Sequence, residues 1–185
     1  LDIGNGQALN LFNVHYRAPL AAFIPGQKSD PFAWKSMAGW AEGYYLASMK
    51  RSGQALETRL AMEDCFERDE KALICVAGDF NAGPEEMPGR IVLGREEDTG
   101  NAALAGRSLI STELSLPEDR RFTVIHSGKR QMLDHILASR GLAARLIDFE
   151  AHNNSLDDEW TDAMNDVLSL SSHHAPIVAE FDLPL

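Results

Sequence analysis

The sequence has no run of 18 consecutive apolar residues, and this absence excludes a transmembrane helix. It has only two cysteines, Cys65 and Cys75, which show neither a Cys-x-x-Cys motif nor the spacing of a metal site. Two reduced, buried thiols are therefore expected rather than a structural disulfide. Internal repeats and low-complexity linkers are absent as well. These absences favour a soluble protein made of one folded unit, with the cytoplasm as the favoured compartment.

Positive charge is scarce in this chain. It has 17 lysine and arginine residues against 28 aspartate and glutamate residues, which gives a formal net charge of -11. The overall field repels polyanions, so local groups or a metal ion must hold any phosphate-bearing ligand. The chain has 185 residues, 44% of them hydrophobic, which is enough for one sizeable core. We therefore expect residues 1–185 to form a single domain that does not coat nucleic acids generically.

Apolar patterning predicts helices early in the chain and strands late. A strand over residues 8–14 follows the turn signal Asn5-Gly6, as the second arm of a β-hairpin would. One helix is predicted to begin at Ser29-Asp30-Pro31, and a second helix is predicted over residues 54–68. This order predicts a mixed α/β domain in which sheets pack on sheets or helices. The other predicted strands are residues 72–77, 108–112, 122–126, 132–138, 144–149 and 177–182, and the segments expected to be irregular are 84–107 and 153–166.

The first predicted helix is rich in aromatic side chains. Such rings usually pack a helix against a sheet, and we expect that role here. A platform on which nucleobases stack would use the same residue types and is the alternative. The rings concerned are Trp34, Trp40, Tyr44 and Tyr45.

Polar residues stand where two predicted strands end. Asp79 and Asn81 follow an apolar strand in the stretch VAGDFNAGP, and His15 ends another strand in NVHYRAP. Side chains two residues apart point to the same side of a strand, so Asp79 and Asn81 can converge on one point above the sheet. Ordinary turn chemistry is the alternative for Asp79 and Asn81, and a plain surface histidine is the alternative for His15.

Asp134 is a charged residue inside the apolar stretch MLDHIL. Burying a carboxylate is costly unless it has a partner. His174, at the start of the last predicted strand, is one candidate, because a carboxylate would fix its tautomer and favour its protonated form. Lys129 and Arg130 are the alternative partners, in a purely structural ion pair.

These motifs, in this order, resemble the endonuclease/exonuclease/phosphatase superfamily. The resemblance rests on GDFN (residues 78–81), the histidine of NVHYRAP, the aspartate of MLDHIL and the stretch SHHAP (residues 172–176). It implies a four-layer α/β/β/α fold, in which a two-sheet β-sandwich is flanked by helices. It also implies metal-dependent hydrolysis of phosphate esters at one edge shared by the sheets.

The resemblance further implies a role for each motif residue. Asp79 would orient or deprotonate the attacking water, and Asn81 would bind a phosphoryl oxygen. His174, positioned by Asp134, would act as a general base or a cationic stabiliser. His15 would bind phosphate or protonate the leaving oxygen. Mg²⁺ or Mn²⁺ is the implied cofactor, with Asp79 and His173 among its ligands.

Two departures from the family pattern concern the metal. His173 stands where much of the family has an aspartate, and imidazole suits Mn²⁺, Zn²⁺ or Fe²⁺ better than Mg²⁺. An Asn and a Glu that complete the family's metal site have no counterpart in this sequence. The sequence therefore matches the later part of the family's domain, and we expect a fold that is incomplete at its N-terminus. Exposed sheet edges would then favour oligomerisation.

The leading functional prediction is a divalent-metal-dependent phosphodiesterase. Its substrate would be a nucleic acid, a phospholipid or a small phosphodiester. The negative net charge makes a long nucleic acid the less favoured substrate. The alternative is a non-catalytic interaction domain with the same fold and a degenerate metal site. An ordinary α/β domain with coincidental motifs is the third interpretation.

Overall fold

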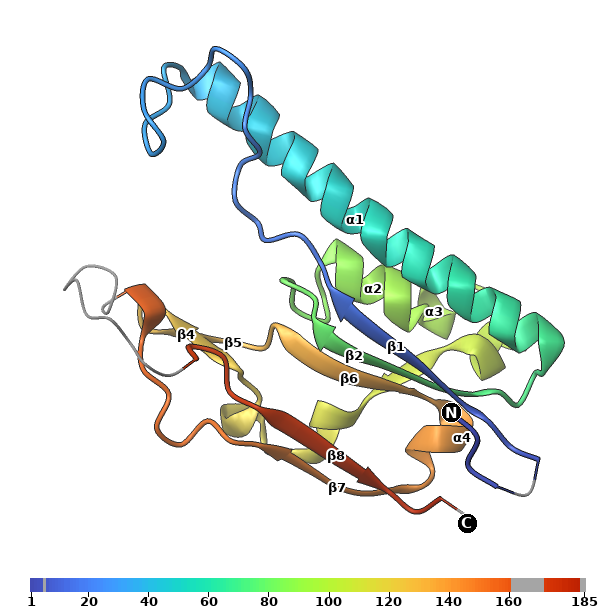
Figure 1. Cartoon of the computed structure of the whole chain (residues 1–185). Helices are drawn as coiled ribbons and strands as arrows, with labels where there is room; N and C mark the ends of the chain where they lie inside the picture. Colours follow the sequence, from blue (N-terminus) through green and yellow to red (C-terminus); the bar gives the residue numbers. More distant parts are fainter. Residues whose placement is uncertain (5, 161–171, 184–185) are drawn as a thin grey trace.

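A four-stranded sheet lies at the centre of the molecule, in the order β1-β2-β6-β3 (Figure 1). The computed structural model describes residues 1–4, 6–160 and 172–183. Strands β1 and β2 run parallel, whereas β2 and β3 both run antiparallel to β6. The strands are β1 (Leu9–His15), β2 (Leu73–Asp79), β6 (Asp134–Ser139) and β3 (Leu109–Ser111).

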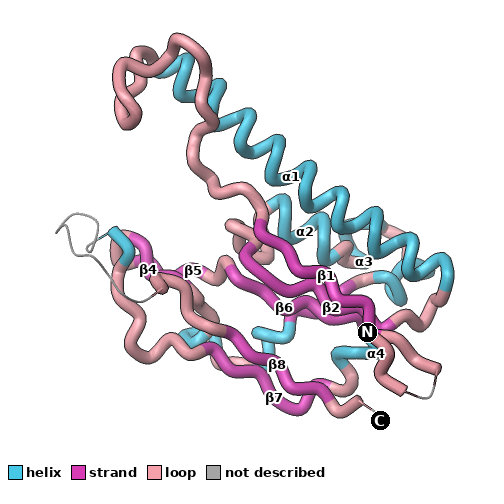
Figure 2. The backbone as a smooth tube through the Cα atoms, viewed as in Figure 1, coloured by secondary structure: helices cyan, strands magenta, loops and turns pink. Residues whose placement is uncertain are grey.

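Helices cover one face of this sheet, and a second sheet lies on the other side (Figures 1 and 2). The covering helices are α1 (Met37–Arg68), α2 (Met87–Leu93) and α3 (Glu96–Thr99). The second sheet is the antiparallel pair of β7 (Leu146–Ala151) and β8 (Ile177–Phe181). The remaining elements are the pair β4 (Val124–His126) and β5 (Lys129–Gln131), helix α4 (Arg140–Ala143), and the 3₁₀ helices η1 (Ala102–Arg107), η2 (Thr112–Ser115) and η3 (Glu118–Arg120).

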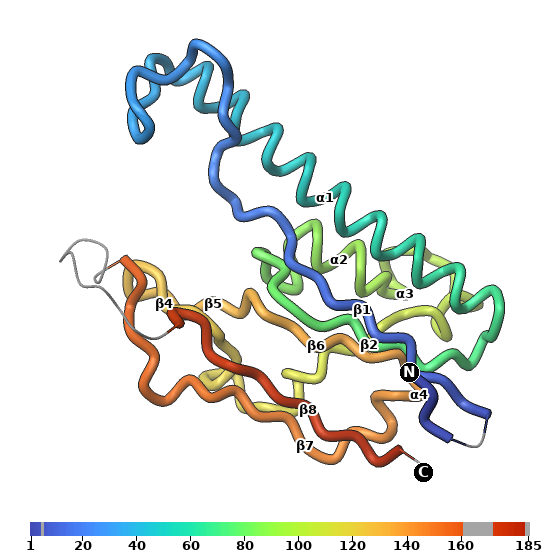
Figure 3. Tube along the Cα trace, in the orientation of Figure 1, coloured from blue at the N-terminus to red at the C-terminus, as the bar shows by residue number. Residues whose placement is uncertain are grey.

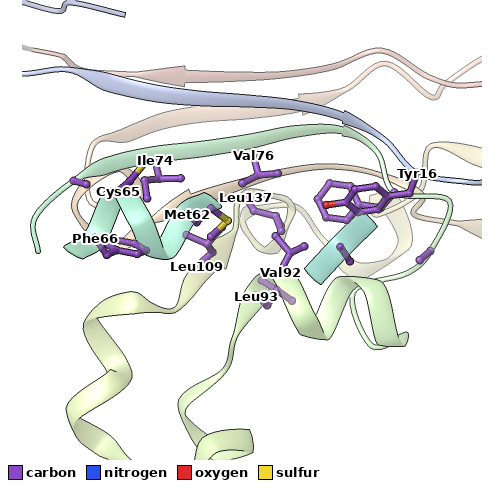
Figure 4. Packing of buried hydrophobic residues seen from close by; sticks show 14 residues of the cluster. Tyr16, Met62, Cys65, Phe66, Ile74, Val76, Val92, Leu93, Leu109 and Leu137 are labelled. Atoms are coloured by element: carbon purple, nitrogen blue, oxygen red, sulfur yellow. The ribbon is translucent and has the colours of Figure 1, made fainter. Parts of the chain in front are cut away.

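Two hydrophobic clusters hold these layers together. The first fills the space between the helices and the central sheet and includes Met62, Phe66 and Val76 (Figure 4). The second lies between the two sheets and joins Ile136 of β6 to Phe149 of β7 and Ile177 of β8. Strand residues alternate between the two clusters, as the two-residue period of a strand requires. The predicted mixed α/β fold with two sheets and flanking helices is confirmed.

The prediction of two early helices is wrong, because α1 is one continuous helix of 32 residues. Its N-cap is Ser36, whose Oγ accepts a hydrogen bond from the N–H of Gly39. The expected cap at Asp30 instead closes a turn by accepting from the N–H groups of Phe32 and Ala33. Gly53 directly precedes the second predicted helix and suggested a break there, since glycine is a poor helix former. Gly43 is needed within α1, because a Cβ would lie 2.4 Å from the carbonyl oxygen of Ala22.

The N-terminal half of α1 extends past the end of the sheet, together with the loop that follows β1 (Figures 1 and 3). Trp34 packs there against Gly43 of the helix. Trp40, Tyr44 and Tyr45 are 41%, 42% and 61% exposed. The expectation that these three rings pack a helix on a sheet is therefore wrong, since the sheet ends before it reaches them.

The prediction of an irregular segment over residues 84–107 is wrong, because this segment contains α2, α3 and η1. Pro88 does not prevent α2, since it occupies the first turn of that helix, where proline is tolerated. Strand β5 was not predicted, because its three residues are polar and exposed and show no apolar pattern. An isolated antiparallel bridge joins Asp2 to Ala8, as the predicted hairpin requires, although Asn5 lies outside the described residues. Of the acidic segment 153–166, residues 161–166 also lie outside them.

Three further expectations concern surfaces and thiols. Cys65 and Cys75 are free and buried, as predicted. Strand β1 forms one edge of the central sheet and leaves Leu11 exposed, so the expected exposed edge is present, while oligomerisation stays a prediction. Among the described residues, no helix has the length and apolar character needed to cross a bilayer.

Candidate active site

Three of the predicted site residues lie in one row across the central sheet. His15, the last residue of β1, is the register partner of Asp79, and Asp79 is the register partner of Asp134. Neighbouring strands are about 4.8 Å apart, so this register places the three side chains at one rim of the sheet. The sheet topology thus assembles residues that are more than 100 positions apart in the sequence.

The loop after β2 holds Asp79 and Asn81 in a fixed arrangement. The Asn81 N–H donates to Asp79 Oδ1 at 2.7 Å, and Asn81 Nδ2 donates both to Asp79 Oδ2 at 2.9 Å and to the Tyr16 carbonyl at 3.0 Å. Asn81 adopts a left-handed φ of 48°. Gly78, at φ 140°, admits no side chain, because a Cβ would lie 1.9 Å from the Val14 carbonyl oxygen. Turn chemistry is therefore present, but it also orients the Asp79 carboxylate.

Asp134 is paired with His174, as the leading interpretation predicted. His174 Nδ1 lies 2.7 Å from Asp134 Oδ2, and the His174 N–H donates to Ser172 Oγ. Thr123 Oγ1 accepts from the Asp134 N–H and so anchors the start of β6. The alternative partner Arg130 instead donates to the Asp119 carbonyl and lies over the Phe122 ring.

Asp79, Asp134 and His174 form a compact cluster. One ligand atom from each lies within 4.8 Å of the others. His15 Nε2 lies 3.5 Å from Asp79 Oδ2, and its side chain is 78% exposed at the outer margin of the cluster. A shallow pocket beside the cluster is lined by Asp134, His174, Asn13, Gly78 and Pro176, among others. His173 is not part of the cluster, so its role as a metal ligand stays a prediction.

The electrostatics of the cluster favour proton transfer. Burial raises the pKa of the Asp79 carboxyl above its ordinary value, and the charge of Asp134 adds to this, although the hydrogen bond from the Asn81 N–H opposes it. The hydrogen bond to Asp134 raises the pKa of His174, against the opposing effect of partial burial. The cluster thus couples a carboxylate that is easier to protonate to an imidazole that is harder to deprotonate.

The donor atoms of the cluster fit a divalent cation in part. Carboxylate oxygens of Asp79 and Asp134 are the ligands that Mg²⁺ and Mn²⁺ prefer. His174 can be a ligand only when it is neutral, and its pairing with Asp134 favours the protonated form. Asp79 and Asp134 are therefore the residues of this cluster that fit a metal best.

Sequence reasoning missed the buried side chains that bind the backbone of the loop after Asp79. Arg51 of α1 donates to the Asn81 carbonyl at 2.6 Å, and His135 Nε2 lies 2.9 Å from the Ala82 carbonyl. The other nitrogen of His135 lies 2.9 Å from Glu113 Oε1. Arg51, His135 and Glu113 are all buried. A sequence pattern rarely shows that a charged residue is buried. The one available sign was His135, which stands within the apolar stretch MLDHIL.

Comparison with known proteins agrees with this geometry. The family model described as the endonuclease/exonuclease/phosphatase family matches residues 3–154. A structure of a variant of the 3′ phosphatase NExo from Neisseria, bound to a product DNA hairpin, is similar with a TM-score of 0.53 at 17% identity. A structure of an AP endonuclease from Archaeoglobus fulgidus is similar with a TM-score of 0.55 at 16% identity.

The two similar structures are longer than this chain. The comparison covers 93% of this chain and 60% of the Neisseria protein, and 95% of this chain and 62% of the Archaeoglobus protein. No curated protein matches the sequence. At identities of 16–17%, the similar structures establish the fold alone. Membership of the family rests on the family model, which matches residues 3–154.

Proposed function

Because the chain belongs to the endonuclease/exonuclease/phosphatase family, we propose that it provides the catalytic rim of a divalent-metal-dependent phosphodiesterase. One observation supports this above all. At one rim of the sheet, one potential ligand atom from each of Asp79, Asp134 and His174 lies within 4.8 Å of the other two. Phosphoryl transfer needs an oriented nucleophile and compensation of charge on the phosphoryl oxygens, and such a cluster can supply both.

Asp79 is proposed as the group that orients the attacking water and accepts its proton. The hydrogen bonds from Asn81 hold this carboxylate in a fixed orientation, which suits a positioned base. Asn81 donates both Nδ2 hydrogens, one to Asp79 and one to the Tyr16 carbonyl. Asn81 therefore positions the carboxylate in this state, and it can bind a phosphoryl oxygen only after it releases one of these acceptors.

His174 and His15 are proposed to stabilise and protonate the substrate. The Asp134 carboxylate holds His174 by its Nδ1, which leaves Nε2 to donate to a phosphoryl oxygen. His15 is exposed beside Asp79, where it can reach the leaving oxygen. The imidazole of His15 beside Asp79 favours a diester, because it resembles the second histidine of the family's phosphodiesterase branches. A divalent cation held by Asp79 and Asp134 would supply Lewis-acid stabilisation of the phosphoryl group.

Hydrolysis of the chromogenic diester bis(p-nitrophenyl) phosphate tests the proposal. The chain is expected to hydrolyse it slowly with Mn²⁺ or Mg²⁺, because the Asn and Glu that complete the family's metal site have no counterpart in it. This activity is expected to be lost in EDTA and in the variant Asp79→Asn. The variant Asp148→Asn is the matched control, since Asp148 is exposed on β7. No hydrolysis with any divalent cation would favour the alternative, a non-catalytic interaction domain. The observation behind that alternative is His173, which stands where the family pattern has an aspartate.

A further inference from the structure

The long helix α1 is tied to the proposed catalytic rim at one point and continues well beyond it. Arg51 donates to the Asn81 carbonyl, which sets the level of the rim along the helix. Trp40 lies eleven residues before Arg51, and a rise of about 1.5 Å per residue places it roughly 16 Å farther out. We use the name arm for residues 17–50, which include this overhanging half of α1 and the loop before it (Figure 1).

Two aromatic rings of the arm share a helix face with Arg51. Residues at positions 40, 44, 51, 55 and 62 follow the 3.6-residue period of one face. Arg51, Ala55 and Met62 are buried against the body of the molecule. Trp40 and Tyr44 continue the same face past the end of the sheet, where they stack on each other at a centroid distance of 5.5 Å. The stacked rings therefore face the side of α1 on which the rim lies.

The arm also carries a net positive charge, although the chain as a whole is acidic. Its residues 17–50 include four Lys and Arg residues against two Asp and Glu residues, for a net charge of +2. The rest of the chain has thirteen against twenty-six, for a net charge of -13. The net charge of the arm therefore attracts a polyanion, whereas the summed charge of the remaining residues repels it.

A hollow at the outer end of the arm combines aromatic walls with a cation. It is lined by Trp34, Lys35, Ser36, Met37 and Trp40, and its volume is about 440 Å³. A second hollow, of about 380 Å³, is lined in part by Arg17 and Lys50. Ring surfaces for bases and ammonium groups for phosphates are the features by which proteins bind single-stranded nucleic acid.

We propose that the arm binds a single strand of nucleic acid and leads it to the rim that holds Asp79. The proposal rests on the phosphodiesterase function proposed above and specifies its substrate class. Roughly 16 Å corresponds to about five stacked nucleotides at 3.4 Å each. A lipid bilayer is the competing partner, because the arm also exposes Leu20, Phe23 and Phe32. A nucleic-acid strand is favoured over it because the stacked rings of Trp40 and Tyr44 lie on the side of the helix that faces the rim.

Binding of a fluorescein-labelled 12-nucleotide single strand, measured by anisotropy in EDTA, tests the proposal without hydrolysis. Tyr44→Ala and Trp40→Ala are each expected to weaken binding by about 5- to 150-fold, the range for loss of one stacked base. Tyr45→Ala is the matched control: Tyr45 is more exposed than Tyr44 and lies about 100° away around the helix. It is expected to change binding less than twofold. Lys35→Gln is expected to reduce the slope of log affinity against log salt by about 0.7.

The outcomes separate this proposal from the proposed function. Equal effects of Tyr44→Ala and Tyr45→Ala, or no binding of the oligonucleotide, would overturn the role of the arm. So would binding of phosphatidylglycerol vesicles that Trp40→Ala abolishes while oligonucleotide binding stays intact. Hydrolysis of bis(p-nitrophenyl) phosphate is expected to be unchanged in the control variant Tyr45→Ala. If that activity is missing from the unmodified chain while the arm binds the strand as expected, the catalytic proposal fails and the nucleic-acid surface stands.

Discussion

Two neighbouring residues of β6, Asp134 and His135, belong to two histidine–carboxylate pairs on opposite faces of the same sheet. On one face, His174 Nδ1 lies 2.7 Å from Asp134 at the half-exposed rim. On the other face, His135 Nδ1 lies 2.9 Å from Glu113, with side chains only 1% and 3% exposed. The two pairs have the same chemistry and nearly the same distance, and they differ in access to solvent.

Access decides what each pair can do. At the rim, His174 Nε2 can meet a substrate, so a proton can be exchanged during a reaction. Both nitrogens of His135 face oxygen acceptors, Glu113 Oε1 and the Ala82 carbonyl, which requires the doubly protonated ring. Burial opposes this charge, yet the hydrogen bond and charge of Glu113 raise the pKa of His135 above its ordinary value. The buried pair therefore supports the Asp79 loop and takes no part in proton exchange.

Replacing the rim histidine is expected to have the largest effect. His174→Gln should lower kcat for bis(p-nitrophenyl) phosphate by about 10²- to 10⁴-fold, the usual contribution of a positioned acid or base. The urea midpoint should change little, because the His174–Asp134 pair is partly exposed and a single such pair contributes little to stability. Steady-state kinetics and urea unfolding on the same preparation check both parts. A fall in activity that only parallels a fall in the folded fraction would contradict the catalytic role.

Replacing the buried His135 should reduce stability more than activity. His135→Leu leaves the Glu113 carboxylate buried without a charged partner, and a broken buried pair costs about 3–5 kcal/mol of unfolding free energy. The double variant His135→Leu with Glu113→Leu should recover most of this loss, because an apolar pair has no charge to desolvate. Urea unfolding of the two variants measures the difference. A single variant that costs less than about 1 kcal/mol would show that the pair does not stabilise the fold.

The sequence predicted the rim pair and missed the buried one for a physical reason. Asp134 stood out because a carboxylate in an apolar strand needs a partner, and His174 followed from a second motif. His135 lies in the same stretch, but Glu113 belongs to a segment whose pattern gives no sign that it is buried. Composition likewise showed that the early helix is rich in aromatic residues, whereas only the structure shows that the sheet ends before Trp40. Local sequence predicts the helix, but what its side chains contact depends on tertiary packing.

The pH dependence of stability should reveal the contribution of the buried His135. A folded-state pKa raised above the unfolded value stabilises the fold fully below the unfolded value, near 6.5 for histidine, and this contribution is lost as pH rises through the folded pKa. The unfolding free energy should thus fall as pH rises above about 6.5. The double variant His135→Leu with Glu113→Leu should flatten this part of the profile. Urea unfolding at pH 5.5 to 9 checks it, and parallel profiles for the two proteins would rule out His135 as the source.

A third pair of the same type provides the smallest expected effect. His152 Nε2 lies 3.2 Å from Glu150 Oε2, and both side chains are more than half exposed. His152→Gln should change the unfolding free energy by no more than about 0.5 kcal/mol, because water screens an exposed pair. It should also leave kcat for the chromogenic diester unchanged, since Glu150 and His152 are not part of the Asp79 cluster. A loss of activity in this variant comparable to that of His174→Gln would show that histidine content, and not location at the rim, determines the rate.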